Sequence, residues 1–581
     1  MNFAKRLSWF FKLEKKRYII GILSLGFVSI FNLIPPKVIG NVVDSIGEKT
    51  LTSNELIVNL IYLIASAFIM YGLRYVWRIC IFGAANNLAR ILRFRLFQHF
   101  TKMSPSFYQK YRTGDLMAHA TNDVNAVSMA SGVGVMSAVD ASITALVTLF
   151  SMFFMLNAKL TLIAIIPLPF LAYFTGKLAK KSHRSFRDSQ EAFSDLNNKV
   201  QESVSGVRVT KSFGYQKSES ISFNKINAVV FDKNITAARY SALFSPMVLI
   251  FIGFSYMLTL VFGGIFIHRG NLTVGELITF ITYLDMLIWP LQAIGYLFYI
   301  AERGEVSYSR IENLLAERSE VVETENVRYK PQGMRIEYNI ESFSYSDKQV
   351  LSNINFTLSK GQTLGIVGVT GSGKTTLLKL LLREYDVKKG EIKIDDINIK
   401  KYKLSDLRSL MGYVPQEQML FAMSIKENIR FADNNFTDKQ VENVAKLCGV
   451  YEDIINMTDG FDTIIGEKGI SLSGGQKQRL AMSRALIMSP EILILDDSLS
   501  AVDAKTENII LNNLKEERKG KTTIITAHRL SAVVHADLIL VMSEGEIIER
   551  GTHEELLSKD GWYKETYNNQ QLEEKLKGEY L

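Results

Sequence analysis

Residues 362–378 read QTLGIVGVTGSGKTTLL. A strand-like apolar run leads through a glycine-rich turn into an apolar helix, which is the context in which such a turn binds phosphate. Glycines let the backbone wrap closely around phosphate oxygens, and the first turn of the helix presents free N–H groups to them. The stretch therefore predicts a nucleotide-phosphate loop formed by Gly368, Val369, Thr370, Gly371, Ser372, Gly373, Lys374, Thr375 and Thr376.

Side-chain chemistry gives two of these residues separate roles. Lys374 neutralises charge on the outer phosphates, and the Thr375 hydroxyl can ligate Mg²⁺. A second strand-like run, 492–495, ends in Asp496-Asp497. An apolar strand that ends in aspartate beside a phosphate loop is the arrangement that holds Mg²⁺ in such ATPases. We therefore expect ATP and Mg²⁺ as cofactors, with Asp496 on the metal.

The N-terminal half of the chain is far more hydrophobic than the rest. Hydrophobic residues make up 47% of the 581 residues, and the excess lies between about residues 18 and 300. A helix needs about 20 mostly apolar residues to cross a bilayer. The segments that reach this length are 18–41, 57–82, 134–156, 160–180, 242–267 and 276–299.

The sequence thus predicts a multidomain chain with two fold classes. Residues 1–311 form an all-α transmembrane domain with six spans, 312–334 an acidic, polar linker, and 335–581 an α/β nucleotide-binding domain. Lys and Arg are concentrated at the N-terminus and in the long, helix-like loops 83–133 and 181–241, which marks these parts as cytoplasmic. The chain has a net charge of +8, and its Lys and Arg residues flank apolar segments. This favours lipid headgroups over nucleic acid as partners.

Short segments outside the spans also carry predictions. The basic, aromatic stretch Lys5–Arg17 is typical of an amphipathic helix at the membrane surface. Thr113–Leu116 with Asn122-Asp123, and Gly206–Gly214, have the composition of turns between long helices. These are either plain turns of helix hairpins or docking elements that meet the nucleotide-binding domain.

Between the phosphate loop and the second strand lies Leu472-Ser473-Gly474-Gly475-Gln476. This pentapeptide resembles the signature sequence of ABC ATPases, and with the membrane half the resemblance to ABC exporters covers essentially the whole chain. Other motifs of that family match in order: Tyr345 resembles the aromatic that stacks on adenine, Gln416 the Q-loop glutamine, Gly466–Gly469 the exporter X-loop, Asp503 the D-loop aspartate and His528 the switch histidine.

The resemblance implies how two such chains work together. Two nucleotide-binding domains face each other head to tail, and each ATP lies between the phosphate loop of one chain and the signature of the other. Ser473, Gly474, Gly475 and Gln476 would then contact the ATP of a partner half-transporter. Gln416 would join Thr375 and Asp496 around Mg²⁺, and Asp497, His528 and Gln416 would be the catalytic residues.

Asp497 departs from the family pattern. The usual residue is glutamate, the general base that polarises the attacking water. Aspartate retracts the carboxylate by about 1 Å, and a misplacement of that size can cost ~10²-fold in rate. The chain thus resembles the degenerate-site subunit of bacterial heterodimeric multidrug ABC exporters. The alternatives are a backbone adjustment that makes Asp497 a normal base, and a homodimer.

The resemblance implies efflux of amphipathic drugs or toxins across the bacterial cytoplasmic membrane. A lipid or lipopeptide translocase, and a regulatory subunit that senses ATP, are the alternatives. Asp140 and Asp285 lie within predicted spans, where a buried carboxylate is costly and usually functional. The alternative to a functional site is, for each, a carboxylate that merely faces a water-filled cavity or has a partner on another helix. We expect Asp285, near Trp289 and Pro290, to face the cavity and to favour cationic cargo.

Overall fold

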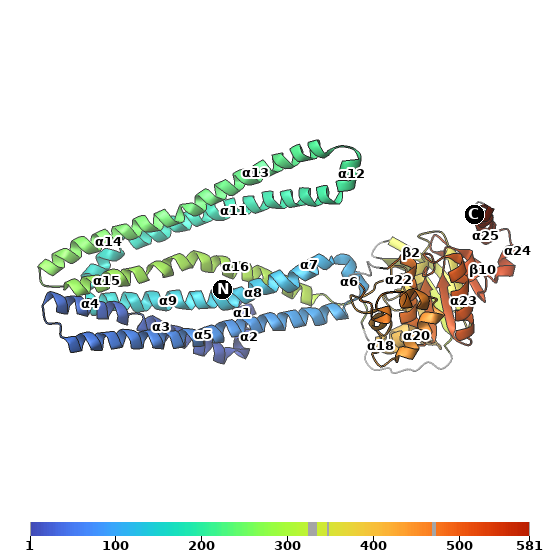
Figure 1. Ribbon diagram of the computed structural model, residues 1–581, viewed down its shortest axis with the longest axis horizontal. Coiled ribbons are helices and arrows are strands. Elements are labelled where there is room, and N and C mark those ends of the chain that lie inside the picture. The colour runs from blue at the N-terminus through green and yellow to red at the C-terminus, as the bar shows by residue number, and fades with distance from the viewer. Residues whose placement is uncertain (1, 323–333, 346–347, 467–471, 580–581) are drawn as a thin grey trace. The chain divides into compact units, whose positions relative to one another are not determined.

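The computed structural model describes residues 2–322, 334–345, 348–466 and 472–579. The chain divides into two compact units (Figure 1). The first contains Met1–Thr101 and Arg112–Glu317, and the second contains Lys102–Tyr111 and Arg318–Leu581. The first unit therefore extends past the predicted limit at 311, and a short segment from its middle, Lys102–Tyr111, belongs to the second unit.

The first unit is a bundle of long helices. Within the described residues, six helical segments are long and apolar enough to cross a membrane, which confirms the predicted number. These segments are Lys15–Gly47, Ser53–Lys102, Thr113–Leu156, Ala158–Ser205, Gln216–His268 and Val274–Ala316. Each contains one predicted span and extends beyond it at one or both ends, because the helix is longer than its apolar stretch.

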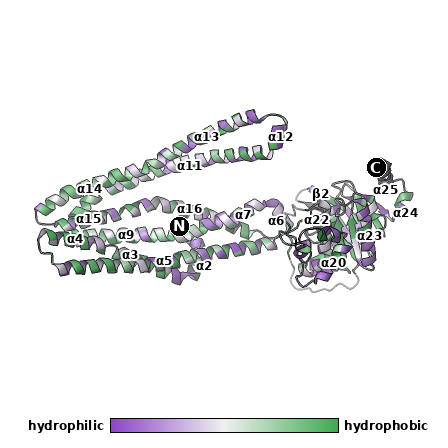
Figure 2. Ribbon diagram, in the orientation of Figure 1, coloured by the Kyte–Doolittle hydropathy of each residue, from purple (hydrophilic) through white to green (hydrophobic). Residues whose placement is uncertain are grey.

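The helices of this unit are α1 (Asn2–Arg6), α2 (Ser8–Leu13), α3 (Lys15–Phe31), α4 (Ile34–Gly47), α5 (Ser53–Lys102), α7 (Thr113–Ala118), α8 (Val124–Met129), α9 (Val135–Ser151), α10 (Ala158–Ile165), α11 (Pro167–Ser205), α12 (Val207–Ser212), α13 (Gln216–Ala242), α14 (Phe244–His268), α15 (Val274–Met286) and α16 (Ile288–Ala316). Three π-helical turns interrupt the third segment: η1 (His119–Asp123), η2 (Ala130–Gly134) and η3 (Met152–Leu156). Figure 2 shows that hydrophobic residues gather near α4, α14 and α15, whereas α12 at the opposite end is hydrophilic.

Proline sets the breaks inside three of the segments. Its ring lacks an N–H and crowds the preceding residue, so a helix ends or bends shortly before it. Helix α3 gives way to α4 ahead of Pro35, α10 to α11 ahead of Pro167, and α15 to α16 ahead of Pro290. The last of these breaks leaves Asp285 in the final turn of α15.

Helices α4 and α15 cross so closely that glycine is required at the contact. A Cβ on Gly275 would meet the carbonyl oxygen of Gly40. The Asp44 carboxylate accepts hydrogen bonds from Gly275 N at 2.7 Å and from Thr273 Oγ1 at 2.6 Å. Small residues at a crossing let membrane helices approach each other, and the carboxylate fixes the start of α15 against α4.

One predicted turn is wrong and the other is confirmed. Thr113–Asp123 is helical throughout, as α7 and η1. The chain leaves the helix earlier, after Lys102, and Ser104 has a ψ of 161° because a proline restricts the residue before it. Gly206–Gly214 does turn: α12 lies at the tip of the α11–α13 hairpin, and Gly214 has a φ of +63° (Figure 1).

The predicted N-terminal helix is present as α1 and α2, and it packs against the bundle. Leu7 and Phe10 are fully buried. Trp9 Nε1 donates to Tyr308 OH at 3.1 Å, and the Arg95 guanidinium lies over the Trp9 ring at 4.2 Å. These contacts tie α2 to α5 and α16.

The second unit contains two sheets. The smaller, antiparallel sheet has the order β2-β1-β4-β5, and the larger has the order β10-β9-β3-β8-β7-β6, with β10 antiparallel to β9 and the other pairs parallel. The strands are β1 (Ile336–Tyr345), β2 (Lys348–Leu358), β3 (Thr363–Gly368), β4 (Lys389–Ile394), β5 (Ile397–Asn398), β6 (Met411–Val414), β7 (Ile492–Asp496), β8 (Thr522–Thr526), β9 (Leu538–Ser543) and β10 (Glu546–Gly551).

The helices of the second unit complete the predicted α/β fold. They are α6 (Pro105–Lys110), α17 (Lys374–Leu381), α18 (Leu404–Ser409), α19 (Ile425–Ile429), α20 (Asp438–Leu447), α21 (Tyr451–Ile455), α22 (Gly474–Leu486), α23 (Ala504–Glu517), α24 (His553–Ser558) and α25 (Trp562–Glu579), with short 3₁₀ turns such as η7 (Leu530–Val533). Apolar side chains of β3, β7, β8 and α17 form a core between the sheets.

Parallel pairing brings the carboxyl ends of β3, β7 and β8 to one edge. Asp496 lies beside Thr526, and Ile366 pairs with Thr526 from the other side. Ligands of open α/β sheets bind beyond the carboxyl ends of the strands. The glycine-rich loop after β3 therefore shares its edge with Asp496 and with His528.

Candidate functional site

The loop after β3 has the curled backbone that its glycines permit. Gly368, Gly371 and Gly373 have φ angles of +141°, +84° and +100°, where a side chain would be strained. A Cβ on Gly368 would meet the carbonyl oxygen of Met542 in β9. Helix α17 follows at once, so the unpaired N–H groups of its first turn lie at the loop. The geometry is that of an anion-binding cradle.

A cavity of about 290 Å³ lies beside this loop. Lys374 Nζ donates to the carbonyl oxygens of Gly368 and Val369, both at 2.9 Å. Burial lowers the pKa of Lys374, and the charges of Asp497 and Asp496 oppose that shift. The cavity is lined by Val350, Thr370, Gly371, Gly373, Lys374, Thr375, Thr376, Gln416, Asp496, Asp497, Thr526 and His528.

Asp496 is buried and accepts hydrogen bonds from three hydroxyl groups. Its Oδ1 accepts from Thr526 Oγ1 at 2.7 Å and from Thr375 Oγ1 at 3.0 Å, and its Oδ2 accepts from Tyr413 OH at 3.4 Å. Burial and then the Asp496 charge raise the pKa of Tyr413, so the phenol stays protonated and donates. A hydroxyl and a carboxylate are hard oxygen donors, and they fit Mg²⁺, which completes its shell with water and phosphate.

Asp497 lies in the left-handed backbone region, with a φ of +47°. Its N–H donates to Thr526 O at 3.1 Å and to Thr526 Oγ1 at 3.0 Å. Its Oδ2 accepts from Gln416 Nε2 at 3.3 Å. His528 is exposed and lines the same cavity. The structure therefore brings the three residues predicted to be catalytic to one place.

Tyr345, predicted to stack on adenine, ends β1 next to the loop. Its OH donates to Thr376 Oγ1 at 3.4 Å, and its ring meets the edge of Tyr385 at 4.9 Å. Tyr385 OH accepts from Gln109 Nε2 in α6 at 2.9 Å. Two tyrosines thus connect the segment Lys102–Tyr111 to the end of the phosphate loop.

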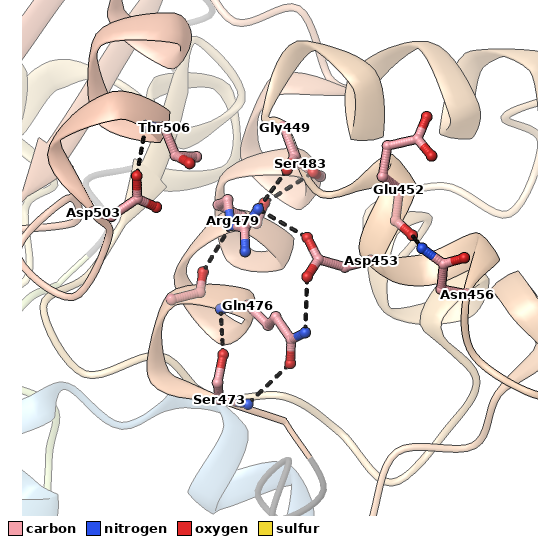
Figure 3. Close-up of polar contacts among 11 residues, drawn as sticks. Gly449, Glu452, Asp453, Asn456, Ser473, Gln476, Arg479, Ser483, Asp503 and Thr506 are labelled. Carbon is pink, nitrogen blue, oxygen red and sulfur yellow. Dashed lines mark hydrogen bonds and ion pairs between the residues drawn. The ribbon is translucent and has the colours of Figure 1, made fainter.

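The signature residues lie outside this cavity, at the start of α22 (Figure 3). Ser473 caps the helix: its Oγ accepts from Gln476 N at 3.3 Å, and Gln476 Oε1 accepts from Ser473 N at 3.0 Å. This reciprocal capping box holds the first turn. Ser473 and Gly474 are exposed, as contact with a second chain would require.

The predicted D-loop packs directly against the signature helix. Gln478 Oε1 accepts from Ala501 N at 3.0 Å, and a Cβ on Gly475 would lie 2.9 Å from the carbonyl oxygen of Ala501. Asp503 caps α23 by accepting from Thr506 N at 3.0 Å, which lowers the pKa of the Asp503 carboxyl. Residues 467–469 of the predicted X-loop lie outside the described residues.

Sequence reasoning missed Thr526, Gln478 and Asp453. Thr526 had little local signal, because β8 reads Thr-Thr-Ile-Ile-Thr and the last threonine does not stand out from the other two. Gln478 and Asp453 had none, since their partners come from distant parts of the chain. Asp453 Oδ1 accepts from the signature residue Gln476, and the two are far apart in sequence (Figure 3).

The two acids of the predicted spans have different surroundings. Asp140 in α9 accepts a hydrogen bond from Trp289 Nε1 in α16 at 3.2 Å, so it has a partner on another helix. Asp285 is exposed at the end of α15. Within the described residues its carboxylate makes no hydrogen bond or ion pair.

Comparison with known proteins identifies the family. The ABC transporter transmembrane region matches residues 18–291, and the ABC transporter domain matches residues 351–500. The chain is 44% identical over 572 residues to the probable multidrug resistance ABC transporter ATP-binding/permease protein YheI of Bacillus subtilis, with 98% of this chain and 97% of that protein covered. It is 41% identical over 576 residues to the multidrug resistance-like ATP-binding protein MdlA of Escherichia coli, with 99% and 97% covered.

A solved structure agrees with these sequence matches. The fold is similar to that of a bacterial Atm1-family ABC exporter with ATP bound, with a TM-score of 0.78, 25% sequence identity and coverage of 96% of this chain and 98% of that one. ABC exporters act as dimers, and the nucleotide-binding domain binds ATP. The chain therefore belongs to the ABC transporter family and is one half of an ATP-hydrolysing exporter, a multi-pass protein of the cytoplasmic membrane whose ATPase domain lies in the cytoplasm.

Proposed function

We propose that this chain is the degenerate-site subunit of a heterodimeric exporter. Its phosphate loop, with Thr375, Asp496 and Gln416 around Mg²⁺, holds ATP. Ser473–Gln476 complete the site of a partner half-transporter, where most hydrolysis occurs. The observation that carries the proposal is Asp497, which stands where ABC ATPases usually have glutamate.

The contacts of Asp497 support the proposal that its carboxylate lies too far back to act efficiently as the general base. Its backbone N–H is bonded to Thr526 in the adjacent strand, at 3.0 and 3.1 Å, which limits any forward shift of the chain. Its carboxylate already accepts from Gln416 at 3.3 Å. Retracting a base by about 1 Å on a backbone held in this way can cost ~10²-fold in rate. ATP at this site then acts mainly as a clamp between the two nucleotide-binding domains.

The proposed cargo is an amphipathic drug or toxin. YheI and MdlA are both named for multidrug resistance. The exposed carboxylate of Asp285, in a segment apolar enough to span the membrane, offers a counter-charge to a cation. ATP drives export only if it binds more tightly to the state in which the nucleotide-binding domains are closed, because a ligand shifts an equilibrium by its differential affinity.

Phosphate release with Mg²⁺-ATP tests the proposal. The purified chain alone, in lipid nanodiscs, should show negligible ATPase activity, and a partner half-transporter with glutamate at the matching position should restore it. Asp497→Glu should raise the rate of ATP hydrolysis by the chain alone by up to ~10²-fold, because the longer glutamate side chain brings the carboxylate forward by one methylene. Asp497→Asn is the matched control, and it should leave the low rate nearly unchanged.

Robust hydrolysis by the unmodified chain alone would reveal an active homodimer and contradict the proposal. Lys374→Ala distinguishes a mechanical subunit from an ATP sensor. In the assembled transporter it should lower cargo export, because the clamp no longer holds ATP. A regulatory sensor would instead keep exporting cargo after this substitution.

A further inference from the structure

We infer that Asp453 is a positioning residue for the ATP bound at the partner's site, because it holds the signature helix through Gln476 and Arg479. This inference rests on the proposed role of Ser473–Gln476 in completing that site. Asp453 lies on α21, and its two carboxylate oxygens bond to the two side chains separately (Figure 3).

The contacts of Asp453 are partly shielded from water. Oδ1 accepts from Gln476 Nε2 at 3.0 Å, and Oδ2 accepts from Arg479 Nη1 at 2.9 Å. The Arg479 side chain is 14% exposed and that of Asp453 is 30% exposed. Charge-assisted hydrogen bonds in such places are stronger than neutral ones. One carboxylate therefore restrains two residues of α22, Gln476 and Arg479, that lie about one helical turn apart.

Gln476 acts as a link inside its own chain. Its Oε1 accepts from Ser473 N, and its Nε2 donates to Asp453, so the oxygen and one N–H of the amide are already used. The Ser473 hydroxyl accepts from Gln476 N, which leaves its hydrogen to donate to a phosphate. Ser473 and the N–H groups of the first turn are thus free to contact the partner's ATP, and Gln476 fixes where they lie.

Arg479 extends the same restraint to Gly475. Its Nε donates to the Gly475 carbonyl at 3.3 Å, and its Nη1 also donates to the Gly449 carbonyl. Without the Asp453 carboxylate, the guanidinium would lose its charged partner and would be held beside Gly475 only by its bonds to two carbonyl oxygens. On the other side of the helix, Gln478 joins α22 to Ala501 of the D-loop. Asp453 and Gln478 therefore hold the signature helix by separate contacts, Asp453 against α21 and Gln478 against the D-loop.

The signature meets ATP only when two chains close around it, so a loose first turn weakens the closed state. This predicts a rise in the ATP concentration needed for half-maximal hydrolysis. A residue with a merely structural role would instead reduce the fraction of active molecules and leave that concentration unchanged. The KM for ATP therefore distinguishes positioning from folding.

The experiment uses the transporter purified in nanodiscs through a tag on this chain, so that any partner half-transporter is retained. Asp453→Leu should raise the KM for ATP about tenfold, the size expected when one charge-assisted hydrogen bond is lost. Asp453→Asn should raise it less, because the amide oxygen still accepts from Gln476. Photolabelling of this chain's own phosphate loop by azido-ATP should stay unchanged, since Asp453 is not among the residues that line its cavity.

Glu452→Gln is the matched control. Glu452 is the adjacent carboxylate on α21, it is exposed, and Figure 3 shows its side chain pointing away from Asp453. The Glu452→Gln substitution removes the same charge as the Asp453 variants and should leave the KM for ATP unchanged. If Asp453→Leu does not assemble, Asp453→Asn decides the question.

An unchanged KM in the Asp453 variants, or a lower kcat at the same KM, would overturn the inference. An equal rise in KM in Glu452→Gln would also overturn it, because the effect would then be one of net charge. The proposed heterodimer fails separately, through robust hydrolysis by the unmodified chain alone. The KM comparison decides the role of Asp453 in either assembly, since both use this signature.

Discussion

Thr526, the last residue of β8, contacts both Asp496, which ends β7, and Asp497, which follows it, and Thr526 is 2% exposed. Its Oγ1 donates to Asp496 Oδ1 at 2.7 Å and accepts from Asp497 N at 3.0 Å. A single hydroxyl thus orients the proposed Mg²⁺ carboxylate and fixes the backbone of the proposed base. Removing one partner of a buried hydrogen bond costs more than the bond itself contributes, because the other partner is left unsatisfied.

We predict that Thr526→Val weakens Mg²⁺-dependent ATP binding by this chain by roughly tenfold, because Asp496 loses a buried donor. Thr526→Ser keeps the hydroxyl and should bind as the unmodified chain does. Titration with a fluorescent ATP analogue, with and without Mg²⁺, measures the affinity. The loss of affinity should appear only when Mg²⁺ is present. Thr522→Val is the control, because Thr522 is a buried threonine at the other end of β8, where its hydroxyl accepts from Gly361 N at 3.2 Å. An equal loss in that control would contradict the prediction.

The sequence located the residues whose identity carries the chemistry. Lys374, Thr375 and Asp496 could be predicted because a glycine-rich loop and a strand end each have a short, local pattern. Thr526 and Asp453 could not be assigned in the same way. Their roles depend on strand register and on packing between distant helices, which the sequence does not show. Motifs name the groups that touch ATP, whereas the residues that hold those groups require the fold.

Among the helices, α16 is joined to the third helical segment by one buried carboxylate. Asp123 in η1 accepts from Ser307 Oγ at 2.8 Å and from Arg310 Nε at 3.1 Å, both on α16. His119 Nδ1 lies 2.7 Å from the same carboxylate. Asp123 is 6% exposed, so its charge depends on these partners. This contact fixes α16 to the third helical segment.

We predict that Asp123→Asn lowers the free energy of unfolding by about 2 kcal/mol, because a buried charged hydrogen-bond partner of Arg310 is lost. The measurement is the thermal unfolding midpoint of the purified transporter in detergent. Asp115→Asn is the matched control, since Asp115 is an exposed carboxylate one helix earlier, on α7. A double-mutant cycle with Arg310→Gln should show that the two losses are not additive. Additive losses would mean that the pair does not interact.

Hydropathy was sufficient to find each membrane helix, but it did not find the irregular turns. The predicted turn at Thr113–Leu116 is helical, and the chain leaves the helix ahead of Pro105 instead. Proline restricts the residue before it, so this break had a sequence signal that the glycine and acid residues of Thr113–Leu116 obscured. The π-helical turns of the third segment have no pattern in the sequence that marks them.

At the scale of the whole chain, three helices end where the chain passes from one unit to the other. The chain crosses from one unit to the other after Thr101, after Tyr111 and after Glu317. These points lie at the ends of α5, α6 and α16. Helix α16 also carries Trp289, which donates to Asp140, and it begins just after Asp285. A movement of the nucleotide-binding domain that shifts α16 would therefore change the surroundings of both acids. Helix α16 thus runs from the surroundings of both acids to the point where the chain leaves the first unit.

We predict that Asp285→Asn lowers export of a cationic amphipathic dye by roughly tenfold, because an opposite charge near a cation in a low-dielectric site is strongly attractive. Export of a neutral dye of similar size should stay within about twofold, since it gains nothing from the carboxylate. Inverted membrane vesicles that contain equal amounts of the transporter give both rates with Mg²⁺-ATP. Asp140→Asn is the comparison, and it should affect both dyes alike, because Asp140 is bonded to Trp289 at 3.2 Å and acts through helix packing. Unchanged cation export by Asp285→Asn at normal protein level would refute the assignment of Asp285 to the cargo cavity.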